Sequence, residues 1–422
     1  MKTKAVVENG FKETEIGLIP EDWEVVNVDK YIQFERGTEP GSENYNKDKK
    51  GVRFLRVVDI SGSRDDKIYT TSKKLKLCKK KDILITFDGS PGIVKQGLEG
   101  AYSSGIRKVV IINKDLFSDY VYYVLRTIYV QRTIEKYTTG VTIKHSSKAI
   151  LHIKIPFFSI QEQQKIAFVL SKIQQAIEQQ DKIIETTKEL KKSLMQKLFT
   201  EGLHGEEQKE TEIGLMPKSW EVKCINEISD KLLGGGTPST KISEYWNGNI
   251  HWTTSKKLGE QIYLFDGEKK ITEQGVNNSS TSLIPKNNLL ISTRVSVGKV
   301  VVNKEDIAIS QDLTGTIINK KLYNAEFLAY QIKTIRIQKI FDEQKRGATI
   351  KGITREDLKG IKLTVPDLKE QTKIAVILLC LDKKLQQAES KKQTLQALFR
   401  TMLNQLMTGK VRVKDFDFEV KN

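Results

Sequence analysis

The sequence predicts an α+β protein in which two mixed α/β domains are joined by two long helices pairing as an antiparallel coiled coil. Three observations support this fold class. The chain repeats itself, two long stretches contain neither proline nor glycine, and short β-rich runs fill the regions ahead of those stretches. The repeat predicts an internal pseudo-two-fold symmetry. With 422 residues, the chain is long enough for two or three domains of roughly 100–200 residues each.

Internal duplication is the strongest organising feature. Lys12–Val25 reads KETEIGLIPEDWEV and Lys209–Val222 reads KETEIGLMPKSWEV, so 11 of 14 positions are identical at an offset of 197. The pattern Glu-Gln-x-Lys-Ile-Ala begins at Glu162 and again at Glu370, an offset of 208. Because this period far exceeds the roughly 20–50 residues of solenoid repeats, the chain is a two-unit duplication.

Each unit contains a strand-rich globular region behind a short arm. Runs of β-branched and other apolar residues alternate there with glycine and Ser/Asn clusters, which is typical of short strands between irregular loops. The predicted strands are Val52–Ile60, Asp82–Phe87 and Arg107–Ile112 in the first region, and Ile250–Thr253, Asn288–Thr293 and Lys299–Val302 in the second.

Two long helices follow the globular regions. Ile160–Thr200 and Leu368–Thr408 lack proline and glycine, and steps of four and three through them give seams that are apolar at 7 and 9 of 10 places. The first seam is Ile166, Leu170, Ile173, Ile177, Gln180, Ile184, Thr187, Lys191, Leu194 and Leu198; the second is Ile374, Leu378, Leu381, Leu385, Ala388, Lys392, Leu395, Phe399, Met402 and Leu406.

Each seam has to be covered, either by the helix's own domain or by the other helix. The equal length and narrowness of the two seams favour pairing with each other, and a two-fold repeat makes that pair antiparallel. The polar seam positions Gln180, Thr187, Lys191 and Lys392 either fix the register or mark patches that bind partner helices.

These features divide the chain into five segments. Residues 1–158 hold an N-terminal arm and the first globular domain, and 159–202 the first long helix. Residues 203–366 hold a linker arm and the second globular domain, 367–410 the second long helix, and 411–422 a tail. The repeat places this tail beside the N-terminal arm. Trp23 and Trp220 occupy equivalent places and are expected to anchor each arm on its domain.

Composition limits the possible partners and location. Lys and Arg total 70 against 53 Asp and Glu, and the resulting net charge of +17 attracts polyanions, most commonly nucleic acid. No apolar run reaches the roughly 18 residues of a membrane span. The N-terminus has no apolar signal core and the three cysteines fit no metal or disulfide spacing, so we expect a cytoplasmic protein.

Loops that combine glycine, small polar and basic residues are the candidate nucleic-acid contacts. Glycine allows close approach of the backbone to a phosphate, and Arg and Lys reach phosphates or base edges. The candidates are Arg36, Thr38, Lys80, Ser90 and Lys144 in the first domain, and Gly236, Thr237, Ser239, Arg294, Ser296, Lys299, Arg346 and Lys351 in the second.

Other motifs give no support for a catalytic, cofactor or metal site. Gly234–Gly236 lacks the spacing of a phosphate-binding P-loop, and the four histidines share no metal spacing with the cysteines. Pro366-Asp367 with Glu389-Ser390-Lys391 imitates a nuclease motif only loosely, because its second part lies within a predicted helix. Trp246 and Trp252 are interpreted as core and turn residues rather than as platforms for stacked bases.

Several segments resemble the specificity (S) subunit of type I restriction–modification systems. Gly234–Trp252, reading GGGTPSTKISEYWNGNIHW, is similar to the start of that family's target-recognition domain, and Leu84–Ser90 and Ala101–Gly105 resemble its middle. The helix openings at Glu162 and Glu370 resemble the start of its long helices. Two segments depart from the family pattern: Gly37-Thr38-Glu39-Pro40 is a degraded form of Gly-Thr-Pro-Ser, and Thr293-Arg294 replaces the Asp-Gly of the first domain.

The resemblance implies two target-recognition domains that each read one half of a split double-stranded DNA site, with the helices as a spacer. It also implies two methyltransferase subunits as partners and restriction subunits reached through the complex, with no catalysis, cofactor or metal in this chain. Three alternatives remain: a free-standing bipartite DNA-binding regulator, a methyltransferase–nuclease fragment and a structural coiled-coil adaptor.

Overall fold

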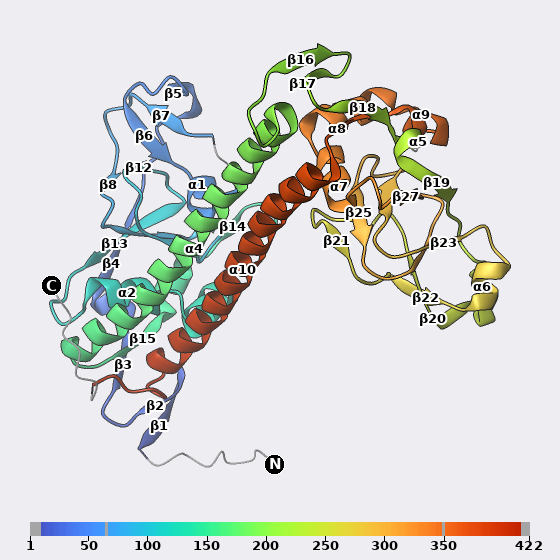
Figure 1. Cartoon of the computed structure of the whole chain (residues 1–422). Helices are drawn as coiled ribbons and strands as arrows, with labels where there is room; N and C mark the ends of the chain where they lie inside the picture. The colour runs from blue at the N-terminus through green and yellow to red at the C-terminus, as the bar shows by residue number, and fades with distance from the viewer. Residues whose placement is uncertain (1–9, 64–65, 348–350, 415–422) are drawn as a thin grey trace. The chain divides into compact units, whose positions relative to one another are not determined.

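The computed structural model describes residues 10–63, 66–347 and 351–414, and confirms the predicted fold class (Figure 1). The chain forms two compact units. The first contains residues 1–180 and 391–422, and the second contains residues 181–390. Each unit therefore combines one globular domain with half of each long helix, α4 (Ile160–Glu201) and α10 (Leu368–Met407).

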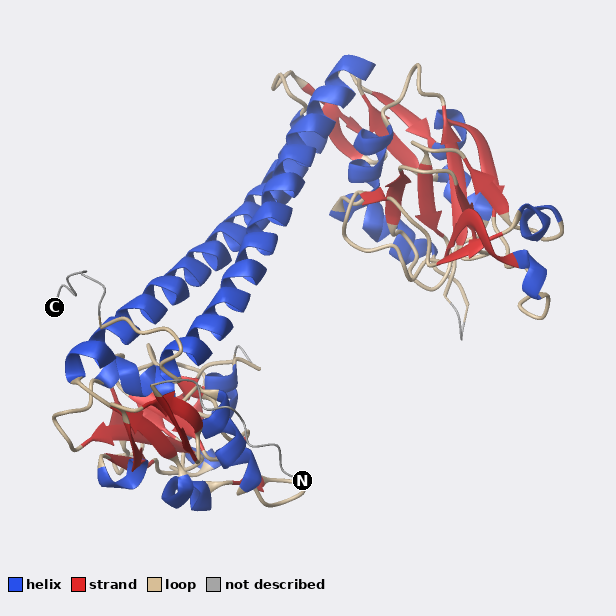
Figure 2. Cartoon of the chain, turned by 90° about the horizontal axis from the view of Figure 1, so that it is seen from below, coloured by secondary structure: helices blue, strands red, loops and turns tan. Residues whose placement is uncertain are grey.

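The first domain is built around two sheets, whose strands are drawn in red in Figure 2. An antiparallel four-stranded sheet has the order β11-β9-β13-β4, and a five-stranded sheet has the order β5-β7-β6-β12-β8 with β6 and β12 parallel. The strands are β4 (Ile32–Arg36), β5 (Tyr45–Asn46), β6 (Val52–Leu55), β7 (Ile68–Thr70), β8 (Leu77–Cys78), β9 (Ile83–Thr86), β11 (Val94–Lys95), β12 (Gly100–Tyr102) and β13 (Ile106–Ile111). All four residues of β9 are buried, as in a strand covered on both faces.

The remaining elements of the first unit hold the arm and close the core. This group contains three antiparallel pairs of strands and three α-helices. They are β1 (Phe11–Thr14) with β2 (Gly17–Pro20), β3 (Glu24–Asn27) with β15 (Lys154–Phe157), β10 (Asp88–Gly89) with β14 (Lys144–His145), α1 (Val57–Ser61), α2 (Ser118–Val124) and α3 (Ile128–Lys136).

The second domain follows the same plan. Its five-stranded sheet has the order β19-β27-β24-β25-β21 and its four-stranded sheet has the order β22-β20-β26-β23. The strands are β19 (Ser229–Gly234), β20 (Trp246–Thr253), β21 (Tyr263–Leu264), β22 (Lys269–Ile271), β23 (Ser282–Ile284), β24 (Leu289–Ser292), β25 (Val300–Asn303), β26 (Ile307–Ile309) and β27 (Leu313–Ile318). The parallel pair β20 and β26 corresponds to β6 and β12 of the first domain.

The second unit is completed by the linker arm and five short helices. These elements are β16 (Gln208–Thr211) with β17 (Gly214–Pro217), β18 (Glu221–Cys224) with β28 (Lys362–Val365), α5 (Ile225–Ile228), α6 (Glu273–Asn277), α7 (Ala325–Ile332), α8 (Ile335–Gln344) and α9 (Arg355–Gly360).

One predicted strand is wrong in its second half. The sequence predicts an extended backbone throughout Val52–Ile60, but β6 ends at Leu55 and α1 begins at Val57. The cause is local, because the Asp59 carboxylate accepts hydrogen bonds from the Arg56 backbone N–H (2.9 Å) and from Arg56 Nε (3.0 Å). This capping interaction favours a helical turn over continuation of the strand.

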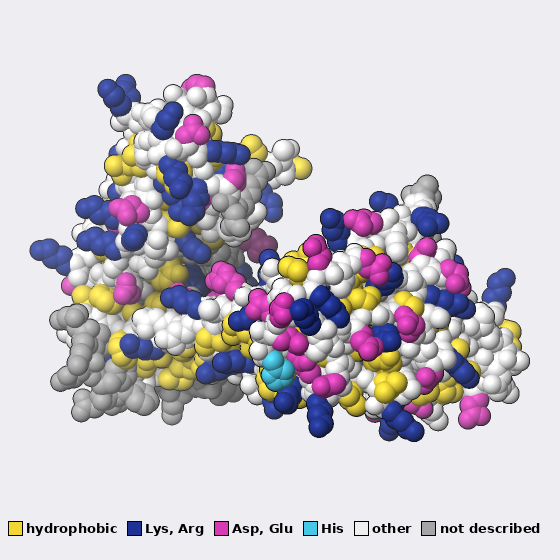
Figure 3. Space-filling model, turned by 45° about the horizontal axis from the view of Figure 1, so that its top comes forward, with side chains coloured by type: hydrophobic (Ala, Val, Ile, Leu, Met, Phe, Trp, Pro, Cys, Tyr) yellow, Lys and Arg dark blue, Asp and Glu magenta, His cyan; other side chains and the backbone are white. Residues whose placement is uncertain are grey.

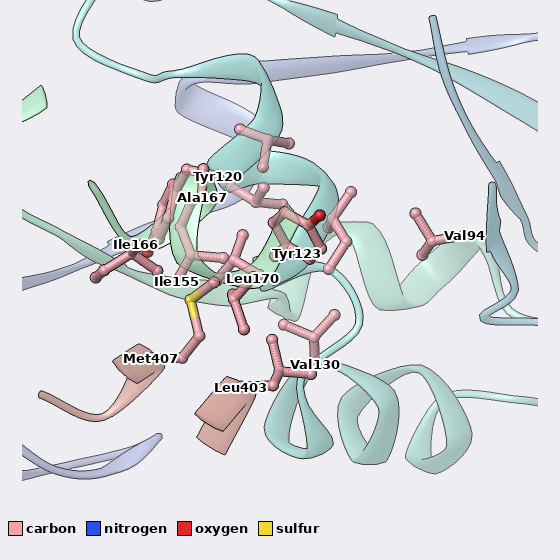
Figure 4. Close-up of a cluster of buried hydrophobic side chains, with 14 of the residues drawn as sticks. Val94, Tyr120, Tyr123, Val130, Ile155, Ile166, Ala167, Leu170, Leu403 and Met407 are labelled. Carbon is pink, nitrogen blue, oxygen red and sulfur yellow. The ribbon is translucent and has the colours of Figure 1, made fainter. Parts of the chain in front are cut away.

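The long helices pair with each other and also pack on the domains. In the first unit the start of α4 shares a core with the end of α10, with Ile166, Leu170, Leu403 and Met407 among its buried side chains (Figure 4). In the second unit the end of α4 meets the start of α10, where the Leu203 N–H donates to Glu370 Oε1 (2.8 Å). The two halves are therefore antiparallel within each unit, and every residue of both predicted seams is buried or half-buried.

Each arm is anchored on a helix start by the same contact. The indole Nε1 of Trp23 donates to Glu162 (3.3 Å), and that of Trp220 donates to Glu370 (3.2 Å). Both tryptophans are fully buried, as predicted for anchoring residues.

The described part of the tail lies beside the N-terminal arm, as the repeat predicts. Arg412 binds both oxygens of Asp22 at 2.8 Å and those of Glu162 at 2.8 and 3.0 Å. The hydrogen bonds from Arg412 lower the pKa of Asp22. Residues 415–422 of the predicted tail lie outside the described part of the chain.

Candidate nucleic-acid interface

A tight turn follows the central strand in both domains. β9 leads into Asp88–Ser90, and β24 leads into Arg294–Ser296. In each turn the N–H of the third residue donates to the carbonyl of the first, at 3.0 Å in the first domain and 2.7 Å in the second. The central residue has a positive φ in both, 77° at Gly89 and 64° at Val295. The two turns are therefore equivalent in backbone geometry.

One carbonyl oxygen holds the start of each turn. The Gly105 carbonyl accepts the N–H groups of Phe87 and Asp88, at 3.0 and 3.3 Å. In the second domain the Asp312 carbonyl accepts the N–H groups of the equivalent residues 293 and 294, at 2.9 and 3.3 Å. The end of each turn is held by a side-chain amide, since Gln131 and Gln338 each donate to a glycine carbonyl at 2.9 Å. Both turns are thus fixed from the domain side, with their tips left accessible.

A glycine-containing segment approaches each turn from the neighbouring strand. A Cβ placed on Gly37 or Gly235 would lie 2.2 Å from two carbonyl oxygens, so only glycine fits at either position. The next residue donates its N–H to the same strand end, Thr38 to the Tyr102 carbonyl (3.0 Å) and Gly236 to that of Ile309 (2.9 Å). These hydrogen bonds align Thr38 with Gly236. The expected match of Gly37-Thr38 to the Gly-Thr of the second domain is therefore displaced by one residue.

A charged cluster lies at the turn of the first domain. His145 Nδ1 is 2.7 Å from Asp88 Oδ1, and Arg107 Nη2 is 3.5 Å from Asp88 Oδ2 and 3.0 Å from Ser147 Oγ. Arg107 is only 5% exposed, and this burial lowers the pKa of its guanidinium, against the raising effect of Asp88. The cluster therefore places a half-exposed imidazole over a buried ion pair.

The second domain has different chemistry at the same places. The strand and turn alignments put Arg294 where the first domain has Asp88, Thr314 where it has Arg107, and Gly352 where it has His145. The expected replacement of Asp88-Gly89 by Thr293-Arg294 is therefore displaced by one residue, because Arg294-Val295 occupies these places. Arg294 is exposed, and no carboxylate among the described residues lies within 4.0 Å of its guanidinium. The turn of the second domain therefore presents a positive charge at its tip, whereas in the first domain the Asp88 carboxylate compensates the charge of Arg107.

Most of the candidate residues of the first domain gather at this end of the sheet. Arg36 is paired with Arg107 in the sheet and donates to the Ser104 carbonyl at 3.3 Å. Ser90 lies in the turn, and Lys144 is paired with Gly89. Lys80 does not join them, because it precedes β9 whereas the turn follows β9.

The candidates of the second domain also gather at one end of its sheet. Arg294, Ser296 and Lys351 meet at the turn, where the Lys351 carbonyl accepts the N–H of Val295. Arg346 forms a bridge with Gly352, and its guanidinium is 3.4 Å from Asp357. Lys299 lies at the base of the turn rather than at its tip, since its carbonyl accepts the Ser292 N–H.

Small polar candidates mainly shape the loops. Thr38 Oγ1 accepts the Lys76 N–H (3.2 Å), and Thr237 Oγ1 donates to Gln311 (2.7 Å). The tryptophans of the second domain have the same role: Trp252 Nε1 donates to the Gly236 carbonyl and Trp246 Nε1 to the Ser239 carbonyl, both at 3.0 Å. Their predicted role as core and turn residues agrees with these contacts.

Basic side chains are abundant on the unit that carries the first domain. Figure 3 shows Lys and Arg over much of the visible face of that unit, with few acidic side chains between them. Six lysines lie within residues 73–81, all of them exposed and with no acidic residue in that segment. This distribution favours contact with a polyanion.

Side chains that could ligate a metal are scattered over the two units. Among residues 10–63, 66–347 and 351–414, no three His, Cys, Asp or Glu side chains are grouped as a metal ion would require. No helix in the described part of the chain has both the length and the apolar content needed to cross a membrane.

The duplication seen in the fold also appears in the comparison with known protein families. The profile of the type I restriction modification DNA specificity domain matches residues 20–188 and again residues 217–397. The chain therefore belongs to the type I restriction modification DNA specificity family.

Relatives cover the chain almost from end to end. It is 29% identical to a putative type I restriction enzyme MjaX specificity subunit of Methanocaldococcus jannaschii, over 96% of this chain and 98% of that one. The MjaVIII specificity subunit of the same organism is 28% identical, over 97% and 98%. The fold is similar to that of the S subunit of a type I restriction–modification system from M. genitalium, with a TM-score of 0.62 and 17% identity over 96% of this chain and 98% of that one.

Proposed function

We propose that this chain is the DNA sequence-specificity subunit of a type I restriction–modification complex and carries no catalytic activity, cofactor or metal of its own. Family membership supports the role. The observation that carries the mechanism is the pair of equivalent turns, which share one backbone geometry but present Asp88 in the first domain and Arg294 in the second. Two domains built this way read two different sequences.

In this proposal each globular domain is a target-recognition domain that binds one half of a split double-stranded DNA site. The candidate residues at the turn end of each sheet make the contacts. A short half-site provides little discrimination alone, at roughly 1–3 kcal/mol per base pair, and two half-sites on one chain multiply it. The continuous helices α4 and α10 set the number of base pairs between the half-sites.

Methyltransferase subunits, two per chain, are the proposed direct partners, with restriction subunits reached through them in the cytoplasm. A groove in the second unit supports protein docking. It has a volume of about 1650 Å³ and lies between the helix halves and the second domain, with Phe199, Ile262 and Phe265 in its walls. Phe265 is 64% exposed, and burial lowers the pKa of Lys333 in the same groove to about 8.

Co-expression with the methyltransferase subunits of the same host tests the proposal. Single-molecule sequencing is expected to show methylation of one bipartite motif only when both proteins are present. Methylation by the purified chain with S-adenosylmethionine alone would overturn the assignment. Methylation of the same motif by the methyltransferase without this chain would do so as well, and binding that never directs methylation would favour a free-standing regulator.

A further inference from the structure

Because the chain is duplicated, the turn Asp88–Ser90 of the first domain can be compared with the equivalent turn Arg294–Ser296 of the second domain. Both place a lysine on the segment that pairs with the turn, Lys144 in β14 of the first domain and Lys351 next to the bridge residue Gly352 in the second, and both turns end in a serine, Ser90 or Ser296. These residues are common to domains that, in the proposed function, read different sequences. Contacts to phosphate are shared between sequences, whereas contacts to base edges are not. The shared residues therefore fit the DNA backbone.

The residues that differ are the ones that carry sequence information. At the first position of the turn the second domain has Arg294, which is exposed and has no carboxylate partner among the described residues. Its backbone is fixed, because its N–H donates to the Asp312 carbonyl and its own carbonyl accepts bonds from Ser292 Oγ (2.9 Å) and the Ser296 N–H (2.7 Å). A guanidinium on a rigid turn is suited to bidentate recognition of guanine O6 and N7.

The residue beside Arg294 gives independent support. Val295 has φ of 64°, a conformation that β-branched residues rarely adopt, and its side chain is 60% exposed. The first domain has Gly89 at this place, with φ of 77° and no strain. Val295 therefore has a strained backbone and little packing within the chain to offset that strain, which is typical of residues held for contact with a ligand. An exposed valine at a turn tip fits the edge of a base step, where a thymine methyl lies.

We propose that Arg294 reads a guanine in the major groove of the half-site bound by the second domain, with Val295 in contact with the adjacent base. This inference rests on the proposed function and adds to it one base and one residue. The first domain makes no such contact at its equivalent turn. There Asp88 is already engaged by His145 and Arg107, and the group presented outward is the imidazole of His145, whose side chain is 60% exposed.

Selection of duplexes from a random-sequence library with the full-length chain tests the proposal. The wild-type chain is expected to select a bipartite motif with a guanine in one half. The Arg294→Ala variant is expected to lose roughly 5- to 150-fold preference for that guanine, the range of one good bidentate contact, with the other half-site unchanged. His145→Ala is expected to alter only the opposite half-site.

Two matched variants separate base reading from general attraction. Lys351→Ala is expected to weaken all sequences alike and to lower the salt dependence by about one counterion, without changing the motif. Val295→Gly relieves the backbone strain and is expected to keep the guanine but lose preference at the neighbouring base.

The outcomes distinguish this inference from the function on which it rests. Retention of the guanine by a folded Arg294→Ala variant, or uniform weakening across all sequences, would overturn the inference and leave the proposed function standing. A wild-type motif without guanine in either half would do the same. A wild-type chain that selects no sequence at all would overturn both the inference and the proposed function.

Discussion

Glycine in the segment that approaches each turn, Gly37 or Gly235, is required by sterics rather than by flexibility. At Gly235 a Cβ would lie 2.2 Å from the carbonyl oxygens of Ile309 and Ser310, and Ile309 is held in the sheet by its pairing with Thr253. We expect Gly235→Ala to lower the free energy of unfolding by about 3 kcal/mol, near the upper end for overpacking. Denaturant unfolding of the full chain measures this loss.

Gly360→Ala is the matched control, because no atom lies within 4 Å of the added Cβ and φ there is not positive. Its free energy of unfolding should be unchanged or slightly higher, since alanine has less conformational entropy to lose. Equal losses in both variants would show that the close approach at Gly235 has no energetic consequence.

Glu35 links stability to pH in the first domain. Hydrogen bonds from Lys76 (2.8 Å) and Lys108 (2.9 Å) lower the pKa of Glu35 from 4.5 to about 2. Because the folded pKa lies below the unfolded one, this stabilisation is complete above about pH 4.5 and is lost as the pH falls towards 2. Partial exposure of the group keeps the effect well below the full value of the shift.

We expect Glu35→Gln to flatten the decrease in unfolding free energy between pH 4.5 and 2 without changing the slope at neutral pH. Urea unfolding at a series of pH values measures both slopes. An unchanged acid slope in the variant would mean that the Glu35 contacts with the two lysines do not persist in solution.

At the residue scale the sequence indicated the loops that form the candidate interface but not the contacts within them. The candidate segments around Arg36 and Ser90 lie together at one end of the first domain's sheet, and the segment around Arg294 lies at the equivalent end in the second domain; their contact with DNA stays a prediction. The Asp88, Arg107 and His145 cluster was missed because its members come from three strands, and only pairing in the sheet brings them together. The available signal was Arg107, one of two basic residues among the apolar residues of β13.

At the scale of elements, the long helices were predictable because their evidence is local and repeated over many turns. The seam positions read from the sequence are the ones that the structure covers, including the polar ones. The sheet order was not predictable, because parallel pairs such as β6 with β12 join strands separated by more than forty residues. The local sequence of either strand does not indicate which strand it pairs with.

The polar seam residue Lys191 has a specific structural explanation in the second unit. Lys191 forms a short ion pair with Asp382, which also accepts a 2.6 Å hydrogen bond from the Tyr330 hydroxyl. The equivalent places in the first unit hold Phe399 and Gln174 beside a tyrosine, and the rings of Phe399 and Tyr123 lie 6.0 Å apart. At equivalent places of the helix pair, the second unit therefore has an ion pair and the first unit has an aromatic contact.

This difference predicts strong coupling between the two charged residues. Asp382→Gln alone removes the counter-charge of a mostly buried lysine and should cost about 1–3 kcal/mol. Adding Lys191→Phe recreates the pair found in the first unit, and the double variant is expected to recover part of that loss. Thermal and denaturant unfolding of the four members of the cycle give the coupling energy, expected to be about 0.5–3 kcal/mol.

Lys188 and Glu389 provide the control cycle on the same helices. Their side chains are 61% and 50% exposed at 3.4 Å, and such a pair is expected to couple by less than about 1 kcal/mol. Additive losses at Lys191 and Asp382, matching those of the control, would contradict the proposed role of the buried pair.

At the scale of the molecule, the same kind of junction occurs twice, once in each unit. Gly202 and Gly409 both have φ of 67° and end a long helix, and each packs against the proline and tryptophan of an arm. The buried glutamate at the start of the opposite helix completes each junction. Because α4 and α10 begin and end in matching junctions, a change of helix length is absorbed only if it is made equally in both.

This constraint makes it possible to test the proposal that α4 and α10 set the spacing between the half-sites. Four residues inserted at the middle of both α4 and α10 lengthen each helix by about 6 Å, which is nearly two base pairs at about 3.4 Å each. We expect the selected or methylated motif to keep both half-sites and to gain about two base pairs between them. Selection from random duplexes, or methylation sequencing in the assembled complex, measures the gap.

An equal insertion into the exposed segment at Lys73 is the control, since that segment belongs to neither helix and the gap should stay the same. Insertion into α4 alone shifts the seam against α10, and it should lower stability without producing a defined new gap. If the doubly extended chain folds, binds and retains the original gap, the helices do not set the spacing. The distance between half-sites would then have to be fixed by the partner subunits, and the duplicated helices would serve only to hold the two domains in one chain.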